Sequence, residues 1–132
     1  MFVLGVSDHI MIAHSFPDPF FGPAQRVHGA TYGVEVELRV AELGPQHVVV
    51  DIGAFRTLLR QSLDTLDYRN LDEHPEFRAK FSTTERVAEH IAGLVAEGLR
   101  GLDAAQRPPP GSSLRVLLRE SPVAWAAYER AL

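Results

Sequence analysis

Two long stretches of alternating residues constrain the fold of this chain more than any other feature of its sequence. In residues 2–14 the even positions are mostly apolar and end with His14. In residues 31–40 every second residue from Tyr32 is apolar, whereas Glu35, Glu37 and Arg39 occupy odd positions. A period of two places the apolar side chains on one face of a strand. The two stretches therefore predict long, half-buried antiparallel strands.

The period changes to that of a helix in the middle of the chain. Residues 54–66 carry leucines and a phenylalanine on one stripe, which predicts a first helix. A second helix begins near Ser82-Thr83-Thr84-Glu85, which offers an N-cap and a capping-box carboxylate. The proline-rich segment 107–113 ends it, a strand is predicted over 114–121, and 121–129 is predicted as a final strand or a short extended segment. This order predicts an α+β fold, a four-stranded antiparallel sheet with two helices on one face.

Composition narrows the class of protein further. The 132 residues fit one domain, 1–132, and the net charge of −4 argues against a broad nucleic-acid surface. No apolar run approaches the length of a membrane span. Asp8 and His9 interrupt the stretch that a signal peptide would need, so we expect a cytoplasmic protein. The absence of cysteine removes disulfides, thiolate metal sites and thiol nucleophiles.

The segment 15–27, SFPDPFFGPAQRV, is a long connection between the first two predicted strands. It has thirteen residues and three prolines. A loop of this length in a small domain is usually functional or covered by a neighbouring subunit. The alternative is a plain surface loop.

Six fragments of the chain resemble, in order, motifs of the 6-pyruvoyl- and 6-carboxy-tetrahydropterin synthases, which share the tunnelling fold. The fragments are IAHSF (12–16), RVHGATY (26–32), VVVDIGAFRTLL (48–59), LDYRNLDE (66–73), STTERVAEHI (82–91) and LLRES (117–121). The resemblance implies a pterin-like substrate such as dihydroneopterin triphosphate. It also implies a homo-oligomer, a trimer or a hexamer of two trimers, whose sheets join edge to edge into a barrel and so close their open edges.

The same resemblance implies a metal site and a proton-transfer site, both altered here. His14 and His28 match two of the three zinc-binding histidines, and Ala30 stands in the place of the third. Ala24 stands where the family has its catalytic cysteine. Another group, such as His9 or a substrate oxygen, would have to complete a zinc site. The alternative is two hydrogen-bonded histidines without metal.

Asp67 and Tyr68 match the aspartate and histidine that assist proton transfer in the family, with tyrosine in place of the histidine. They are the candidate catalytic residues, although Tyr68 could equally be an interface residue. For substrate binding, the resemblance implies that Glu120 accepts hydrogen bonds from the amino group and ring N–H of a pterin. Thr84 and Glu85 match further pterin contacts, and Glu85 is equally a capping-box residue.

The remaining polar residues with a predicted role are structural. Asp51 is expected at the start of the first helix, where a carboxylate suits the helix dipole. His74 and His90 have no partner at a suitable spacing, so we expect both to be solvated.

Two functions follow as hypotheses. The first is a divergent enzyme of lyase type that cleaves a carbon–oxygen or carbon–carbon bond in a pterin or a related heterocycle, without the standard synthase activity. The second is a non-catalytic ligand-binding or assembly protein on the same scaffold. An enzyme whose substrate is not a pterin is a third possibility.

Overall fold

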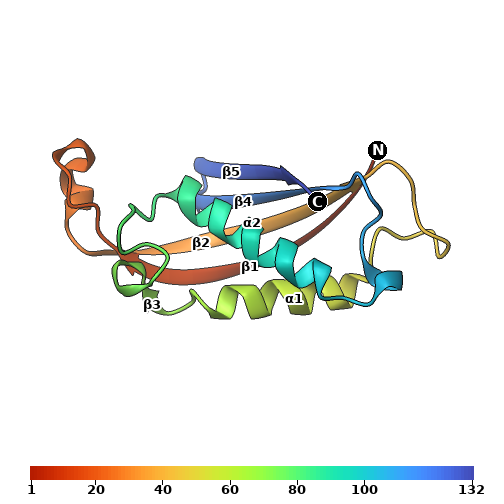
Figure 1. Cartoon of the computed structure of the whole chain (residues 1–132). Helices are drawn as coiled ribbons and strands as arrows, with labels where there is room; N and C mark the ends of the chain where they lie inside the picture. Colours follow the sequence, from red (N-terminus) through yellow and green to blue (C-terminus); the bar gives the residue numbers. More distant parts are fainter.

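A long hairpin forms the centre of the fold. A computed structural model of the protein describes all residues from Met1 to Leu132. Strand β1 (Phe2–His14) pairs antiparallel with β2 (His28–Val40) along its whole length, from Phe2 opposite Val40 to His14 opposite His28 (Figure 1). Both predicted strands are confirmed, and β2 begins three residues earlier than predicted, at His28 rather than residue 31.

Two further strands extend the sheet beyond β2. Strand β4 (Ser113–Ser121) pairs antiparallel with β2, and β5 (Ala124–Ala131) pairs antiparallel with β4. At the opposite edge of the sheet, β3 (Arg69–Asn70) runs parallel to β1 beside Ile12 and Ala13. The strand order is therefore β3-β1-β2-β4-β5. The prediction of four antiparallel strands is therefore short by one parallel strand. A strand of two residues carries no alternation that a sequence could reveal.

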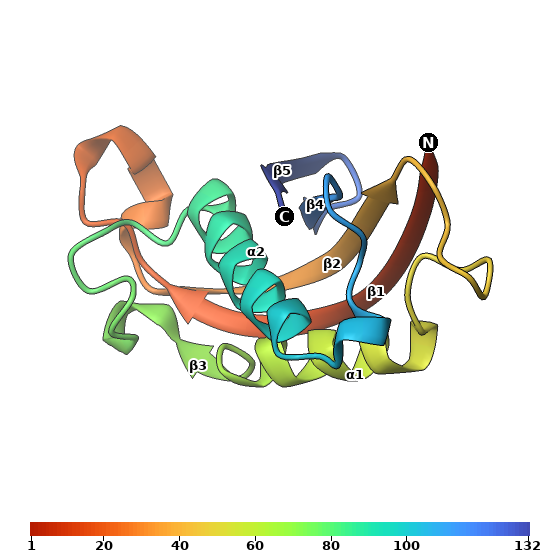
Figure 2. The same ribbon diagram turned by 45° about the vertical axis from the view of Figure 1, so that its right-hand side comes forward.

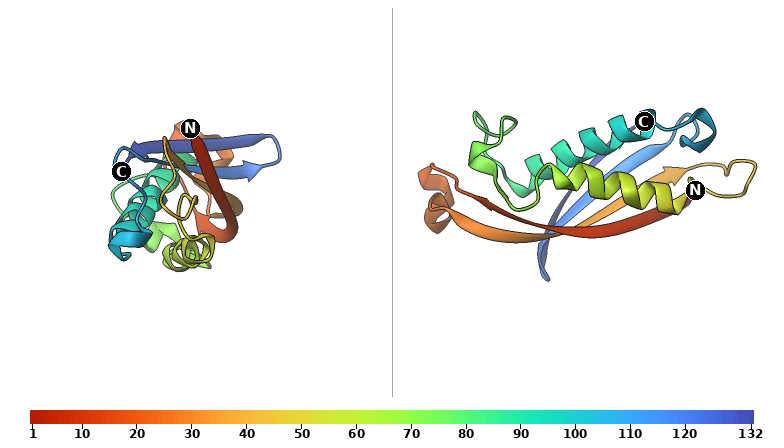
Figure 3. Two further views of the ribbon diagram at one scale, coloured as in Figure 1. Left: turned by 90° about the vertical axis from the view of Figure 1, so that its right-hand side faces the viewer. Right: turned by 90° about the horizontal axis from the view of Figure 1, so that it is seen from below.

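Both helices lie on the same face of the sheet, as predicted (Figures 1 and 3). Helix α1 spans Ile52–Asp64 and helix α2 spans Thr84–Arg100. Asp51 caps α1, since its Oδ1 accepts a hydrogen bond of 2.6 Å from the backbone N–H of Ala54. Three short 3-10 helices complete the chain: η1 (Pro19–Gln25), η2 (Leu71–Glu73) and η3 (Ala104–Gln106). No helix is both long and apolar enough to cross a membrane.

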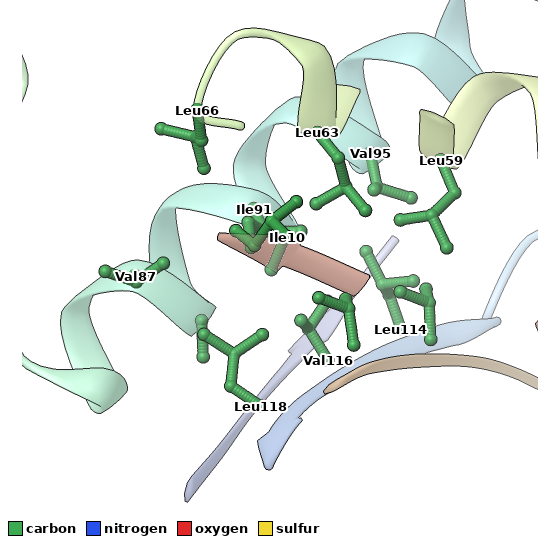
Figure 4. Packing of buried hydrophobic residues seen from close by; sticks show 14 of the residues in the cluster. Ile10, Leu59, Leu63, Leu66, Val87, Ile91, Val95, Leu114, Val116 and Leu118 are labelled. Carbon is green, nitrogen blue, oxygen red and sulfur yellow. The ribbon is translucent and has the colours of Figure 1, made fainter. Parts of the chain in front are cut away.

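The hydrophobic core fills the space between the helices and the sheet. Figure 4 shows Leu114, Val116 and Leu118 of β4 facing side chains of α2 and α1 across the core. The labelled residues on the opposite side are Leu59, Leu63 and Leu66 from α1 and the segment after it, and Val87, Ile91 and Val95 from α2. They belong to one cluster of 25 buried residues, which supplies the main driving force for folding.

The other face of the sheet is polar and is covered by no helix. Arg115 of β4 forms ion pairs with Glu37 of β2 at 3.6 Å and with Glu129 of β5 at 3.2 Å. Arg119 pairs with Glu35 at 3.2 Å. The charged odd positions of the sequence therefore lie together on this outer face.

The connections gather at two ends of the molecule. Figure 2 shows η1 and the segment between β3 and α2 at the end where β1 passes into β2, whereas the segment 41–51 and η3 lie at the opposite end. The segment 15–27 is closed on itself by a 3.0 Å hydrogen bond from the N–H of Phe16 to the carbonyl oxygen of Ala24. The first of these ends carries most of the predicted site residues.

Candidate functional site

The two predicted zinc ligands are direct cross-strand neighbours. His14 ends β1 and His28 begins β2, and the register of the hairpin places them opposite each other. Their ring centroids lie 4.6 Å apart, with an angle of 61° between the planes. His14 is only 3% exposed, whereas His28 is half-buried. We call these two residues the histidine pair.

Backbone carbonyl groups fix both imidazoles in the same tautomer. Nδ1 of His14 lies 3.1 Å from the carbonyl oxygen of Ser82 and 3.0 Å from its Oγ. Nδ1 of His28 lies 2.8 Å from the carbonyl oxygen of Arg26. Because a carbonyl oxygen only accepts, Nδ1 carries the hydrogen in each ring and Nε2 keeps its lone pair. This is the tautomer that presents Nε2 to a metal or to a hydrogen-bond donor.

Electrostatics favour the neutral form of His14. Burial is the main cause that lowers its pKa, and His28 lowers it further. The backbone hydrogen bond with Ser82 and the charge of Asp72 act in the opposite direction. Nε2 of His14 has no hydrogen-bond partner within the chain. It is not fully buried either, because Nε of Arg39 is the only buried side-chain nitrogen or oxygen atom without a partner. Solvent therefore reaches Nε2 of His14.

The histidine pair does not form a complete zinc site with other residues of this chain. No group of three or more His, Asp or Glu side chains is placed to hold a metal ion. Ala30 lies on the same face of β2 as His28 and offers only a methyl group. The suggestion that His9 could enter the site is wrong, because β1 has no bulge there and the side chain is 76% exposed on the opposite face. Two ligands do not fit a catalytic zinc site, which takes three protein ligands.

The three predicted substrate-binding residues lie near a buried tyrosine. Tyr32 lies two residues beyond Ala30 on the same face of β2 and is fully buried. Burial is the main cause that raises its pKa, the nearby Thr84 side chain lowers it, and the carboxylates of Glu120 and Glu85 raise it. The pairing of Gly33 with Arg119 also places Glu120 beside Tyr32. We call Tyr32, Thr84, Glu85 and Glu120 the tyrosine cluster.

Glu85 is not a capping-box residue. The N-cap of α2 is Thr83, whose Oγ1 accepts a hydrogen bond from the N–H of Arg86 at 3.3 Å. A capping box on Thr83 would need its carboxylate at position 86, and that residue is an arginine. The alternative reading of Glu85 is therefore wrong, and its carboxylate remains part of the tyrosine cluster. Ser82 does not cap the helix either, since it contacts His14.

The predicted catalytic residues Asp67 and Tyr68 do not contact the histidine pair in the same chain. Oδ1 of Asp67 accepts a hydrogen bond of 2.9 Å from the N–H of Met11, and Oδ2 pairs with Arg60 at 2.9 Å. The N–H of Tyr68 donates to the carbonyl oxygen of Met11 at 2.7 Å. Asp67 and Tyr68 thus form hydrogen bonds with the backbone N–H and the carbonyl oxygen of Met11 at the edge of β1.

The Tyr68 side chain points into solvent. Tyr68 is 81% exposed and has a φ of 59°, a left-handed conformation that is strained for a residue with a side chain. The structure therefore leaves this phenol free to contact something outside its own chain.

Phenylalanine side chains from two segments line the histidine pair. Phe16 packs against the rings of His14 at 4.6 Å and His28 at 5.8 Å. Phe21 lies 4.7 Å from Phe16 and 5.1 Å from Phe81, which precedes α2. We call Phe16, Phe21 and Phe81 the phenylalanine wall. Two phenylalanines of the segment 15–27 therefore pack at the histidine pair, whereas most of the segment is exposed.

The prediction that His74 and His90 are solvated is wrong. Their rings lie 5.6 Å apart and both pack on Phe77, which is buried. Burial lowers the pKa of His90, and the carboxylate of Glu76 opposes this effect. His90 lies in α2 and His74 directly after η2, so no periodic pattern in the sequence reveals their contact.

Sequence reasoning missed several residues that build the site. Tyr32 lies on the same face of β2 as His28 and Ala30, because all three occupy even positions. The alternation of the sequence could therefore have indicated Tyr32. Ser82 and Asp72 gave no such signal, because their contacts with His14 and Ser15 join residues far apart in the chain. Oδ1 of Asp72 accepts from the N–H of Ser15 at 3.0 Å, and Oδ2 accepts from its hydroxyl at 2.6 Å.

Comparisons of the whole chain with known proteins identify its family. The family model for 6-pyruvoyl tetrahydropterin synthase matches residues 4–131. The chain is 30% identical over 131 residues to the 6-carboxy-5,6,7,8-tetrahydropterin synthase of Bacillus subtilis, a match that covers 96% of this chain and 84% of the relative.

Solved structures show the same fold. The 6-pyruvoyl tetrahydropterin synthase of Caenorhabditis elegans superposes with a TM-score of 0.79 at 24% identity, over 98% of this chain and 96% of the other. The enzyme of Plasmodium vivax superposes with a TM-score of 0.70 at 18% identity, over the full length of both chains. The chain belongs to the 6-pyruvoyl tetrahydropterin synthase family.

Proposed function

We propose that the protein binds a pterin or a closely related heterocycle and acts on it as a divergent lyase-type enzyme, breaking a carbon–oxygen or carbon–carbon bond. The observation that carries this proposal is the tyrosine cluster, which lies on the same face of the sheet as the histidine pair. The cluster supplies carboxylates for ring recognition, and the pair supplies imidazoles beside it.

In this proposal Glu120 anchors the ring. A carboxylate matches the two donors of a pterin edge, the amino group and the adjacent ring N–H, in a bidentate hydrogen bond. With the ring held beside Tyr32, its 6-substituent extends along β2 past Ala30 towards the histidine pair. The neutral Nε2 of His14 then accepts a proton from a hydroxyl group of that substituent.

A homo-oligomer, a trimer or a hexamer, completes the proposed site. Strand β5 pairs with nothing but β4, and β1 is covered by β3 only at Ile12 and Ala13, so both edges of the sheet are free to pair with other copies. Tyr68 is exposed at the β1 edge. In an assembly it would act as an acid or base in a neighbouring site, with Asp67 as its positioning residue.

The standard synthase activity is expected to be negligible. Ala24 and Ala30 carry no titratable group where the family has a cysteine and a third histidine. Loss of one positioned acid–base group lowers a rate by about a hundred- to ten-thousand-fold. When several groups act as a unit, the loss of any one of them removes most of their joint contribution. Robust turnover of dihydroneopterin triphosphate to the standard products would contradict this part of the proposal.

The direct test is a binding titration with dihydroneopterin, followed by pterin fluorescence or calorimetry, on wild type and Glu120→Gln. The substitution keeps the size of the side chain but replaces one acceptor by a donor, so we expect affinity to fall by at least about tenfold. Glu42→Gln is the matched control, because Glu42 is exposed just after β2, at the end of that strand far from His28. Equal affinity in wild type and Glu120→Gln would refute the anchoring role.

The two alanines also favour a second candidate, a non-catalytic pterin-binding or assembly protein. This candidate also predicts weaker dihydroneopterin binding in Glu120→Gln, but it predicts that no new product forms. Incubation of the protein with dihydroneopterin at high enzyme concentration, followed by chromatography, separates the two.

A further inference from the structure

We propose that the segment 71–81 is a pH-operated strap beside the histidine pair, closed while His74 and His90 are neutral and opened when they take up protons. The segment joins β3 to α2 and includes Asp72 and Phe81, which contact the candidate site. The proposal does not depend on which ligand the site binds. Three features support it: a hydrogen bond that only neutral His74 accepts, a stack of three rings, and the charges around the two histidines.

One hydrogen bond within the strap requires neutral His74. Nδ1 of His74 accepts it from the backbone N–H of Glu76, with 3.1 Å between the two nitrogens. Because a backbone N–H only donates, Nδ1 carries a lone pair, and the hydrogen of the neutral ring is on Nε2. A further proton can bind only at Nδ1, where it would face the N–H of Glu76. Protonation of His74 therefore breaks this hydrogen bond.

A stack of three rings holds the strap against α2. Phe77 is only 4% exposed, and its ring centroid lies 5.6 Å from that of His74 and 5.4 Å from that of His90. The two imidazoles are themselves 5.6 Å apart. Protonation of both would place two like charges at this distance, where they repel each other and are partly removed from water. The closed strap therefore favours neutral rings.

The charges around His90 do not offset added protons. The hollow that contains His90 is lined by side chains of α2, of β5 and of the strap. Its charged residues are three carboxylates and four cations: Glu76, Glu89, Glu97, Lys80, Arg86, Arg100 and Arg130. Glu76 is already paired with Lys80 at 3.2 Å, and Glu89 is paired with Arg86 at 2.6 Å. The surroundings of His90 therefore carry a slight excess of positive charge.

The charges around His74 are nearly balanced. The titratable or charged side chains that line the same hollow as His74 are Tyr68, Arg69 and Glu73. Glu73 is the one carboxylate among them, and Arg69 offsets its charge. No excess of negative charge therefore favours the protonated form of His74 in the closed strap.

The direction of the pH effect follows from His90. Burial is the main cause that lowers its pKa below 6.5; Glu76 raises the pKa, and His74 and Lys80 lower it. A group whose pKa is lower in the closed state than in the open state stabilises the closed state at high pH, and this contribution is lost as the pH falls. We therefore expect the strap to be closed near pH 7.5 and to open as the pH drops below about 6.5.

Opening of the strap would reach the histidine pair through both of its ends. Near its start, the carboxylate of Asp72 accepts hydrogen bonds from the N–H and the hydroxyl of Ser15, the residue after His14. At its end, Phe81 belongs to the phenylalanine wall and precedes Ser82, whose carbonyl oxygen lies 3.1 Å from Nδ1 of His14. Acid is therefore expected to loosen the surroundings of His14.

The test is hydrogen exchange of the backbone amides in the full-length chain, measured by NMR at pH 7.5 and 5.5. Rates are expressed as protection factors, which remove the intrinsic effect of pH on exchange. Over this range, opening becomes up to about tenfold more favourable for each histidine of ordinary pKa that is protonated only in the open state. We expect protection of the amides of Glu76, Phe77 and Ser15 to fall by about ten- to a hundredfold. Val36, at 0% exposure in the centre of the sheet, should keep its protection.

Two substitutions separate the two protons. His74→Asn keeps a side-chain oxygen that can accept from the N–H two residues later but does not titrate. His90→Gln removes the other titratable ring. Each single variant should retain a change of about tenfold, and the double variant should retain none. His47→Asn is the matched control, because His47 is exposed at the opposite end of the molecule and its φ of 60° suits asparagine; it should respond to pH as wild type does.

Equal protection at the two pH values in wild type would overturn the proposal. A full loss of protection in the double variant would also overturn it, because other groups would then respond to the pH. An equal loss at Val36 would mean that acid unfolds the whole domain instead of opening the strap. If Glu76 loses protection and Ser15 does not, the strap does not act on the histidine pair, and that part of the proposal is refuted.

Discussion

Asp67 offers a direct test of whether a predicted catalytic residue has a structural role. Both of its carboxylate oxygens are engaged, Oδ1 by the N–H of Met11 and Oδ2 by Arg60, and its side chain is only 18% exposed. In Asp67→Ala the N–H of Met11 loses a charged acceptor, and a hydrogen bond to a charged group contributes about 1.5–3 kcal/mol. The ion pair adds less than about 1 kcal/mol, since Arg60 keeps Asp8 and Asp64 as partners.

We therefore expect Asp67→Ala to lower the free energy of unfolding by about 2–4 kcal/mol, measured by urea denaturation with circular dichroism. Asp67→Asn keeps an oxygen for Met11 and should lower it by only about 1 kcal/mol. Asp64→Asn is the control: it removes an exposed partner of the same arginine, and it should change the free energy by less than about 0.5 kcal/mol. If Asp67→Ala is as stable as wild type, the contacts with Met11 and Arg60 do not stabilise the fold, and the structural role is refuted.

Three further predictions concern packing, pH and metal. Gly98→Ala should destabilise the protein by about 1–3 kcal/mol relative to Gly93→Ala in urea unfolding. The reason is that a Cβ at Gly98 would lie 2.8 Å from Cγ of Leu58, whereas a Cβ at Gly93 would meet open space. Equal stabilities of the two variants would contradict the close contact of α1 with α2. Burial lowers the pKa of His90 below 6.5, so the unfolded chain binds the proton more readily and stability falls as the pH drops below about 6.5. His90→Gln should therefore flatten the dependence of the unfolding midpoint on pH between about 7 and 5. An unchanged slope would contradict the contribution of His90. Ala30→His should retain about one zinc ion per chain after dialysis, measured by atomic emission, whereas wild type should retain far less; equal retention would show that other groups complete a metal site.

The regular elements could be read from the sequence because each has a periodic signature. The alternation ending in His14 predicted β1 to its last residue, and the apolar stripe around Leu58 and Leu63 predicted α1. The short β3 and the 3-10 segment η2 had no such signature: β3 pairs with β1, and Asp72 of η2 accepts hydrogen bonds from Ser15, far away in the sequence.

The candidate site was predictable only in part, for a related reason. Glu120 and Thr84 were identified by resemblance, and the structure places both beside Tyr32. The partners of His14 could not be predicted, since Ser82 lies 68 residues away in sequence. The N-cap of α2 moved from the expected Ser82 to Thr83, which decided the position of Glu85 as well.

The residues at the start of α2 lie next to both parts of the candidate site. Ser82 lies within hydrogen-bond distance of the His14 imidazole at the end of β1, and Thr84, two residues later, lies near the phenol of Tyr32 in β2. A shift of this helix along the sheet by even a fraction of its 5.4 Å pitch would displace both contacts together. His14 and Tyr32 are therefore both contacted by one short segment, the three consecutive residues Ser82 to Thr84. A substitution that moves the start of α2 is therefore expected to displace His14 and Tyr32 together.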